Sequence, residues 1–412
     1  MATTVTLSDI QAARCTLRDV IFATPLLPAE RLSEELGAKI FYKAENTQFS
    51  GSFKIRGAYN TLSRLSEEER DKGIIAASAG NHAQGVALAA QQLGIRATIV
   101  MPERAPLTKV VATRRLGAHV VLSGATFDDA GAMARQQQEE HGFIPIHAFD
   151  DPRVIAGQGT IGLELAETLP NLDLLIVPIG GGGLISGIAI ATKALCPDLR
   201  IIGVQAAGCA PVPNSLAAGE PIAVPTAHTI ADGIAVKCPG ELTLPIIHEL
   251  VDEIVTVEDN EIVLAIAHVV QNSRMVVEGA GAAGVAALLS GKVQPNPNQV
   301  TATILCGGNI DGNLLSRVLE QAMARQGRYL LVYTTVGDWP GNLAPLINKV
   351  AEAGANVVDI FHRRAAWLAP VDRTGIEMVL EVRDKAHGQT VIEHLESAGY
   401  YINQGAYTHW PR

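Results

Sequence analysis

The sequence predicts an α/β protein with parallel sheets flanked by helices, followed by a smaller α+β unit at the C-terminal end. Three observations support this fold class. Apolar runs of strand length alternate with patterns of helical period, glycine-rich turns follow several of these runs, and the composition changes after Gln326-Gly327. Strands that alternate with helices pair in parallel through right-handed crossovers. The 412 residues suffice for two or three domains with a large core.

The alternation forms two series along the chain. In the first, strands are expected at residues 40–43, 74–77, 97–101 and 119–122, with helices at 57–65, 83–93, 107–116 and 127–141. In the second, strands are expected at residues 174–178, 201–205 and 300–305, with helices at 157–168, 184–195, 258–272, 281–289 and 314–324. Each series predicts strands that pair in parallel.

The pattern differs after residue 328. Strands are expected at residues 328–336, 355–362 and 375–382, helices at 342–353 and 388–399, and a last strand at 400–407. The order β-α-β-β-α-β predicts a compact unit with its own turn signals.

Composition and charge exclude several functions. The net charge is −10 and no run of Lys or Arg is present, so nucleic acid is not an expected partner. Residues 1–25 lack the apolar region of a signal peptide, and Pro178 and four glycines interrupt the uncharged stretch 174–192. We therefore expect a cytoplasmic protein without a membrane segment. The five cysteines form no C-x-x-C pair and the histidines have no metal-ligand spacing, so no metal is expected.

Lys54 is the first candidate for chemistry. It lies between two glycines in the segment Ser50-Gly51-Ser52-Phe53-Lys54-Ile55-Arg56-Gly57-Ala58, ahead of an expected helix. Glycine lets a backbone approach a ligand closely. A lysine amine forms a Schiff base with an aldehyde and can later act as a base. Taken alone, a solvated surface charge is the commoner state of a lysine, so the hypothesis depends on the residues that follow.

A run of four glycines forms a second candidate site. Gly180, Gly181, Gly182 and Gly183 separate an expected strand from the helix that begins at Leu184. Backbone N–H groups and the positive end of the helix dipole meet at such a turn, which favours a phosphate. The run does not match the spaced G-x-G-x-x-G pattern of dinucleotide folds. A tight turn without a ligand is the alternative.

Asn81 and Cys306 also follow expected strands, on the ligand side of a parallel sheet. The Asn81 amide could hydrogen-bond an aromatic hydroxyl. The Ser78 hydroxyl and the N–H groups of the turn Ser78-Ala79-Gly80-Asn81-His82 could bind a substrate carboxylate. A helix cap is the alternative for Asn81, and a buried inert thiol is the alternative for Cys306. His82 is expected to be structural.

A Schiff-base lysine, a phosphate loop, an amide for a ring hydroxyl and a neutral group for a ring nitrogen are together suited to pyridoxal phosphate. The matching segments are SGSFKIRGA, SAGNHAQGVA, GGGGLISG, TIADGIAVK and CGGNID. Through them, residues 20–320 resemble the threonine dehydratase (threonine ammonia-lyase) and serine dehydratase group of fold-type II pyridoxal-phosphate enzymes. The C-terminal segment resembles an ACT domain, which is ferredoxin-like, through residues 338–343.

The resemblance implies a catalytic domain at residues 1–325, with a small subdomain at about 45–155 inserted in the larger one, and a regulatory domain at 328–412. The implied catalytic residue is Lys54. The implied cofactor-binding residues are Phe53, Lys54, Asn81, Gly180, Gly181, Gly182, Gly183, Leu184, Gly233 and Cys306. The implied substrate-binding residues are Ser52, Ser78, Ala79, Gly80 and Asn81, and the implied effector residues are Asp338, Gly341 and Asn342.

Two departures distinguish this chain from the serine racemases of the group. Racemases carry a serine where this chain has Ala79, so the acid on the second face is absent and racemisation is expected to be poor. Their metal site uses carboxylates at a position where this chain reads Gln205-Ala206-Ala207-Gly208-Cys209. A divalent metal is therefore not expected, whereas carbonyl groups could hold a monovalent cation.

The implied activity is deamination of L-threonine to 2-oxobutanoate and ammonia, with L-serine as a secondary substrate that gives pyruvate. Such an enzyme serves isoleucine biosynthesis or threonine catabolism. The alternatives are a serine or 3-hydroxyaspartate dehydratase and a non-enzymatic amino-acid sensor, and the intact Lys54 argues against the sensor. The resemblance also implies a homodimer or homotetramer, with an amino acid such as isoleucine or valine bound to the ACT-like domain.

Overall fold

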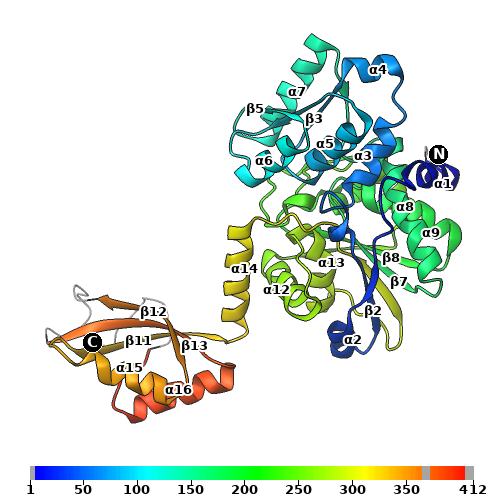
Figure 1. Cartoon of the computed structure of the whole chain (residues 1–412). Helices are drawn as coiled ribbons and strands as arrows, with labels where there is room; N and C mark the ends of the chain where they lie inside the picture. Colours follow the sequence, from blue (N-terminus) through cyan, green and yellow to red (C-terminus); the bar gives the residue numbers. More distant parts are fainter. Residues whose placement is uncertain (1–4, 364–371, 404–412) are drawn as a thin grey trace. The chain divides into compact units, whose positions relative to one another are not determined.

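The computed structural model describes residues 5–363 and 372–403 (Figure 1). The chain divides into two compact units, Met1–Leu315 and Ser316–Arg412. The first unit contains two sheets built mainly from parallel strands, and the second contains an antiparallel sheet. The predicted fold class is therefore confirmed. The division falls inside helix α14 (Gly312–Arg325), ahead of the boundary at residues 325–328 that the sequence suggested.

The larger sheet has the strand order β1-β2-β10-β7-β8-β9. β1 pairs antiparallel with β2, whereas the other pairings are parallel. β7 and β10 are buried along their whole length, and helices α9 (Gly183–Leu195) and α13 (Gly279–Leu289) both contact β7. The two helices lie on opposite sides of the sheet in Figure 1. The strands are β1 (Leu26–Pro28), β2 (Lys39–Lys43), β10 (Val300–Ile304), β7 (Leu174–Pro178), β8 (Arg200–Ala206) and β9 (Glu253–Val257).

The smaller sheet takes all its strands from the chain between β2 and β7, in the order β5-β4-β3-β6, and every pairing is parallel. Neighbouring side chains of β4 face opposite cores, as the period of a strand requires. Ile99 packs with residues of α3 (Lys54–Leu62) and α5, whereas Val100 packs with residues of α7. The elements are β3 (Ile74–Ala77), α5 (Asn81–Leu93), β4 (Ala97–Met101), α6 (Leu107–Arg115), β5 (His119–Leu122), α7 (Phe127–His141) and β6 (Ile144–Pro145).

The second unit has the predicted β-α-β-β-α order and the strand order β11-β13-β12. Its core lies between the sheet and helices α15 and α16, with Val332, Met378 and Leu346 fully buried. Of the predicted last strand at residues 400–407, the structure places one bridge, between Tyr333 and Asn403, and residues 404–407 lie outside the described part. The elements are β11 (Tyr329–Gly337), α15 (Leu343–Glu352), β12 (Asn356–Arg363), β13 (Arg373–Glu381) and α16 (Lys385–Ser397).

Helix α3 (Lys54–Leu62) begins at the lysine itself, not at Gly57 as the sequence suggested. Gly57 lies inside α3, on the side that packs closely on α8 (Pro152–Thr168). A Cβ at Gly57 would lie 2.4 Å from Nε2 of Gln158, so only glycine fits at this position. The glycine therefore serves helix packing. The other helical segments of this unit are α1 (Leu7–Leu17), α2 (Glu30–Leu36), η1 (Glu45–Thr47), α4 (Glu67–Lys72), α10 (Pro211–Ala218), η2 (Asp232–Ile234), α11 (Thr243–Leu250), α12 (Asp259–His268) and η3 (Val269–Ser273).

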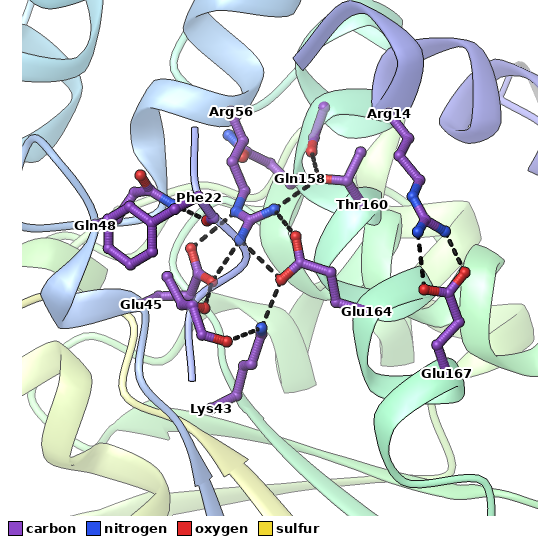
Figure 2. A network of polar contacts seen from close by, with 12 residues as sticks. Arg14, Phe22, Lys43, Glu45, Gln48, Arg56, Gln158, Thr160, Glu164 and Glu167 are labelled. Carbon is purple, nitrogen blue, oxygen red and sulfur yellow. Dashed lines mark hydrogen bonds and ion pairs between the residues drawn. The ribbon is translucent and has the colours of Figure 1, made fainter. Parts of the chain in front are cut away.

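A buried network of charged side chains joins α3 to β2, η1 and α8 (Figure 2). Arg56 donates to Glu45 at two points, 2.9 Å from Nε to Oε2 and 2.8 Å from Nη2 to Oε1. Its Nη1 also donates to Glu164 Oε1 at 2.5 Å and to the Thr160 hydroxyl at 3.1 Å. On the other side of Glu164, the ammonium of Lys43 donates to Oε2 at 2.5 Å.

The network pairs two positive with two negative side chains, so it is electrically neutral. Burial works against the charge of Arg56, but Glu45 and Glu164 hold its pKa above the ordinary value. Burial also works against the ionised form of Glu164, whose pKa is nevertheless lowered by Arg56 and Lys43. A buried ion pair adds little stability over apolar packing, but loss of one partner leaves an unpaired charge. The network therefore fixes how the first turn of α3, which carries Lys54, lies against α8 and β2.

Replacing Arg56 by methionine should lower the free energy of unfolding by about 3–5 kcal/mol, because the buried Glu45 would lose its charged partner and Glu164 would keep only Lys43. The matched control is Arg14→Met. Arg14 pairs with Glu167 at the surface (Figure 2), where an ion pair contributes about 0–1 kcal/mol. Urea unfolding followed by circular dichroism measures both variants. Equal small losses for the two would show that α3 does not depend on the buried network.

Candidate active site

A cavity of about 1110 Å³ lies at the carboxyl ends of parallel strands in the first unit. Its lining includes the turns after β3, β6, β7 and β10, the start of α3, one face of α7 and the segment that forms η2. The predicted residues that line it are Phe53, Lys54, Ser78, Ala79, Gly80, Asn81, Gly180, Gly181, Gly182, Gly183, Leu184, Gly233 and Cys306. Ser52 is not among the lining residues. Its side chain is buried, and its hydroxyl has no hydrogen-bond partner within the described residues.

Lys54 extends its amine into the cavity from the start of α3. Nζ donates to the carbonyl of Ala148 at 2.9 Å and lies 5.1 Å from the centre of the Phe53 ring. Helix α5 packs so closely that a Cβ at Gly85 would lie 3.0 Å from the Cβ of Lys54. Burial lowers the pKa of Lys54 to about 8, against the opposing effects of Cys306 and Glu278. A substantial fraction of the amine is therefore neutral, and nucleophilic, slightly above neutral pH.

The glycine run forms a turn with no room for side chains. A Cβ at Gly181 would lie 2.4 Å from the Phe149 ring, and Gly182 has a φ of 100°, in the left-handed region that favours glycine. The hydroxyl of Thr243 donates to the carbonyl of Gly181 at 2.6 Å and so holds the turn. Helix α9 begins at Gly183, and its first N–H groups have no partner within the helix. This geometry suits an anion.

Asn81 begins helix α5 and hydrogen-bonds across the site instead of capping the helix. Its Oδ1 accepts from Nδ2 of Asn309 at 2.7 Å, and its Nδ2 donates to Oε1 of Glu278 at 2.6 Å. In the same turn, the Ser78 hydroxyl accepts from the N–H of Gly80 at 3.2 Å. The predicted turn therefore brings an amide, a hydroxyl and the start of a helix to the cavity.

Cys306 follows β10, and its carbonyl accepts from the N–H of Phe53 at 3.2 Å. This bond and the bridge between Ser52 and Gly307 join the lysine segment to the end of the larger sheet. Burial raises the pKa of the Cys306 thiol, and the nearby Glu278 raises it further. The thiol is therefore neutral at ordinary pH, as the sequence hypothesis required of this position.

Glu278, His147 and Phe149 are among the lining residues that sequence reasoning missed. Glu278 is the only charged residue between Arg274 and Lys292, and this isolated acid in an apolar run was the available signal. His147 Nδ1 accepts from the N–H groups of Phe149 and Asp150 at 3.3 and 2.7 Å, so it shapes the turn that supports the glycine run.

Other predicted features lie apart from the cavity or carry no chemistry within it. Nε2 of His82 lies 3.0 Å from the carbonyl of Ile146, and burial lowers its pKa to about 3, so it is neutral and structural.

In the second unit, Asp338 donates its N–H to the Asp372 carbonyl at 3.0 Å. Asn342 precedes α15 and donates to the Gly337 carbonyl at 3.3 Å, and Gly341 has a φ of 96°.

Within residues 5–363 and 372–403, no group of three or more His, Cys, Asp or Glu side chains is placed to hold a metal ion. The helices of the same ranges include none that is long and apolar enough to span a membrane.

The cavity combines an amine of lowered pKa, a helix start free of side chains, an amide and a neutral thiol. These groups fit pyridoxal 5′-phosphate, whose aldehyde, phosphate, ring hydroxyl and ring nitrogen need such partners. Fold and site together define an enzyme that depends on this cofactor.

Comparison with known proteins identifies the family. Residues 17–307 match the family described as pyridoxal-phosphate dependent enzyme. The L-threonine ammonia-lyase of Thermotoga maritima is 48% identical over 398 residues, which are 97% of this chain and 99% of the relative. The chain therefore belongs to the pyridoxal-phosphate dependent enzyme family, and the predicted resemblance to the threonine dehydratase group is confirmed.

Two solved structures show the same fold. Threonine deaminase isoform 2 from Solanum lycopersicum has a TM-score of 0.73 and 43% identity, covering 77% of this chain and 87% of that one. A serine racemase from maize has a TM-score of 0.73 and 37% identity, covering 78% of this chain and 99% of that one.

The lowered pKa of Lys54 has a measurable consequence. Since only the neutral amine attacks an aldehyde, the rate at which cofactor-free enzyme takes up pyridoxal phosphate should rise with pH and level off above about 8. Stopped-flow absorbance between pH 6 and 10 measures this profile. A rate still rising steeply at pH 10 would indicate a lysine of ordinary pKa and would contradict the site described above.

Proposed function

We propose that this chain is an L-threonine ammonia-lyase that uses pyridoxal 5′-phosphate, releases ammonia from L-threonine to give 2-oxobutanoate, and deaminates L-serine to pyruvate as a secondary activity. The observation that carries the proposal is the buried amine of Lys54, which shares one cavity with the glycine turn at the start of α9. The 48% identity to an L-threonine ammonia-lyase over nearly the whole chain supports the choice of substrate.

Each lining residue then has a role. The N–H groups of Gly180 to Gly183 and Leu184 would hold the cofactor phosphate, and Asn81 would donate to the ring hydroxyl. Gly233 and Phe53 would border the ring. Ser78, Ala79 and Gly80 would bind the substrate carboxylate through the turn at the start of α5. Ser52 would contribute to the carboxylate site only after a small movement, since it does not line the cavity.

Bound pyridoxal phosphate supplies an electron sink next to the Cα of the amino acid. Lys54 offers a neutral amine that accepts the proton from Cα. The neutral Cys306 thiol cannot give the ring nitrogen the full positive charge that a carboxylic acid would give it. A ring nitrogen without that charge would favour prompt loss of the β-hydroxyl, which would leave as water after it is protonated, over slower side reactions.

Ala79 supports elimination over racemisation. A racemase needs a second acid or base on the face of Cα opposite the lysine, and the methyl group of Ala79 has no proton to transfer. The fold is shared with a maize serine racemase, so the fold alone does not decide between the two reactions.

A panel of β-hydroxy amino acids tests the proposed function. We expect ammonia release to be fastest from L-threonine and slower from L-serine and 3-hydroxyaspartate. Lys54→Ala should abolish release from all of them, with unchanged circular dichroism, because it removes both the anchor and the base. Near-wild-type ammonia release by this variant would refute the assignment, and a preference for 3-hydroxyaspartate would point to the alternative dehydratase.

We further propose that the unit Ser316–Arg412 joins copies of the chain into a homodimer or homotetramer and binds an amino-acid effector. The left-handed Gly341 and the N-terminus of α15 near Asp338 and Asn342 suit a carboxylate. Edge strand β12 exposes Val358 and Phe361, an arrangement that favours pairing with another copy. A pure assembly unit without a ligand is the alternative.

A cytoplasmic location and a bound monovalent cation stay predictions from the sequence.

Truncation after Gln326 tests the effector role. An effector acts only if it binds two states of the enzyme unequally, so isoleucine or valine should change the threonine kinetics of the full-length enzyme and leave those of the truncated enzyme unchanged. Kinetics across a series of amino acids, with sedimentation of both forms, measure this. If no amino acid changes the full-length kinetics, the sensor role fails and an assembly role is left.

A further inference from the structure

Glu278 is a buried carboxyl at the cavity for which the roles above give no function. It is 2% exposed and immediately precedes α13. Although it occupies the N-cap position of that helix, its side chain forms no capping bond there and instead accepts from Nδ2 of Asn81 at 2.6 Å. The carboxyl is therefore directed to Asn81, a residue 197 positions away in the sequence.

The contacts of Asn81 determine which way round its amide lies. Nδ2 of Asn309 donates to the backbone carbonyl of Ser50 at 2.9 Å, and a carbonyl can only accept. The same Nδ2 lies 2.7 Å from Asn81, so the Asn81 atom at that contact is the acceptor Oδ1. The opposite atom is then Nδ2, directed to Glu278. An amide nitrogen has two N–H groups, so one is left for a ligand in the cavity.

Two glycines leave room for the carboxyl. A Cβ at Gly307 would lie 2.2 Å from Oε1 of Glu278 and 2.9 Å from Nδ2 of Asn81. A Cβ at Gly233 would lie 3.1 Å from the same Oε1. Gly307 and Gly233 come from different segments, after β10 and in η2. The segment after β10 and the segment that forms η2 therefore both converge on the contact between Glu278 and Asn81.

The surroundings of Glu278 disfavour the ionised form of its carboxyl in the folded protein. Burial, and to a smaller extent the charge of Asp232, raise the pKa of Glu278 to about 7 against opposing effects of Lys109, Asn81 and Lys54. A raised carboxyl pKa means that ionisation of Glu278 works against the folded state. A side chain with this property is expected where it serves a site, not where it serves packing.

We propose that Glu278 is a positioning residue that, together with Asn309, fixes the Asn81 amide so that an N–H faces the ring hydroxyl oxygen of the cofactor. The inference rests on the proposed function, because it concerns the same cofactor. Without the acceptor, one N–H of Asn81 loses its partner and the amide is held from one side only. Without either anchor, the amide can present its oxygen to the ring oxygen, and two acceptors repel.

The test measures cofactor affinity by titrating cofactor-free protein with pyridoxal phosphate and recording the absorbance of the bound form. Glu278→Leu, which removes the acceptor, should weaken affinity about ten- to hundredfold, the range for leaving a buried donor without a partner. Glu278→Gln keeps a carbonyl acceptor without the charge and should stay within about threefold of wild type. Asn309→Leu should weaken affinity in the same direction as Glu278→Leu.

Melting temperature of the cofactor-free protein distinguishes positioning from a structural role. The control is Leu288→Ala, a fully buried position in α13 that does not line the cavity and should lower the melting temperature without a tenfold change in affinity. Glu278→Leu should keep or raise the melting temperature at pH 8, because it removes a buried acid. A melting temperature lowered as far as that of Leu288→Ala, or failure to fold, would overturn the proposal in favour of a structural role.

Two further results are decisive. Wild-type affinity in Glu278→Leu would overturn the positioning role while leaving the proposed function intact. If Glu278→Gln lost as much affinity as Glu278→Leu, the charge and not the hydrogen bond would matter, which also contradicts positioning. Failure of the wild-type protein itself to bind pyridoxal phosphate would instead refute the proposed function, so the two failures are distinguishable.

Discussion

The contact of Arg56 with Glu45 and Glu164 is the interaction on which the placement of the catalytic amine depends. It joins α3, a helix that packs with the smaller sheet, to η1 and α8, and Lys43 extends the network to β2 of the larger sheet (Figure 2). Arg56 is two residues from Lys54, less than one helical turn, so a change in how the guanidinium lies would move the amine. Burying four charged groups without net stabilisation is reasonable where a fixed geometry is required.

Close backbone approach is the second constraint. The first turn of α3 contacts α5 at Gly85 and α8 at Gly157, where added Cβ atoms would lie 3.0 Å or less from the α3 backbone. In the turn before α9, added Cβ atoms at Gly181 and Gly183 would lie 2.4 and 2.8 Å from atoms of Phe149. Glycine is needed at Gly85 and Gly157 because a side chain there would push α5 or α8 away from the helix that carries the lysine. The high glycine content thus reflects helix packing as much as ligand binding.

Local patterns in the sequence predicted most of the strands but not β1, β6 and β9. They also singled out the glycine turn, Lys54, Asn81 and Cys306, because each follows a strand or precedes a helix and such positions face ligands in parallel sheets. The start of α3 was placed three residues late, because Gly57 looked like a boundary when it is a packing position. Glu278 was missed because its partner, Asn81, is distant in the sequence and only the folded chain brings them together. Ser52 was assigned to substrate binding only by resemblance to the family motif, and its side chain does not line the cavity.

The central claim is that Lys54, and no other lysine, holds the cofactor. Reduction of the cofactor-loaded enzyme with borohydride fixes the linkage, and peptide mass spectrometry then locates the added phosphopyridoxyl group. Lys109 and Lys237 line the same cavity and serve as internal comparisons. We expect the added mass on the peptide that contains Lys54 and on no other. The added mass on Lys109 or Lys237, or a protein that takes up cofactor without any modified lysine, would contradict it.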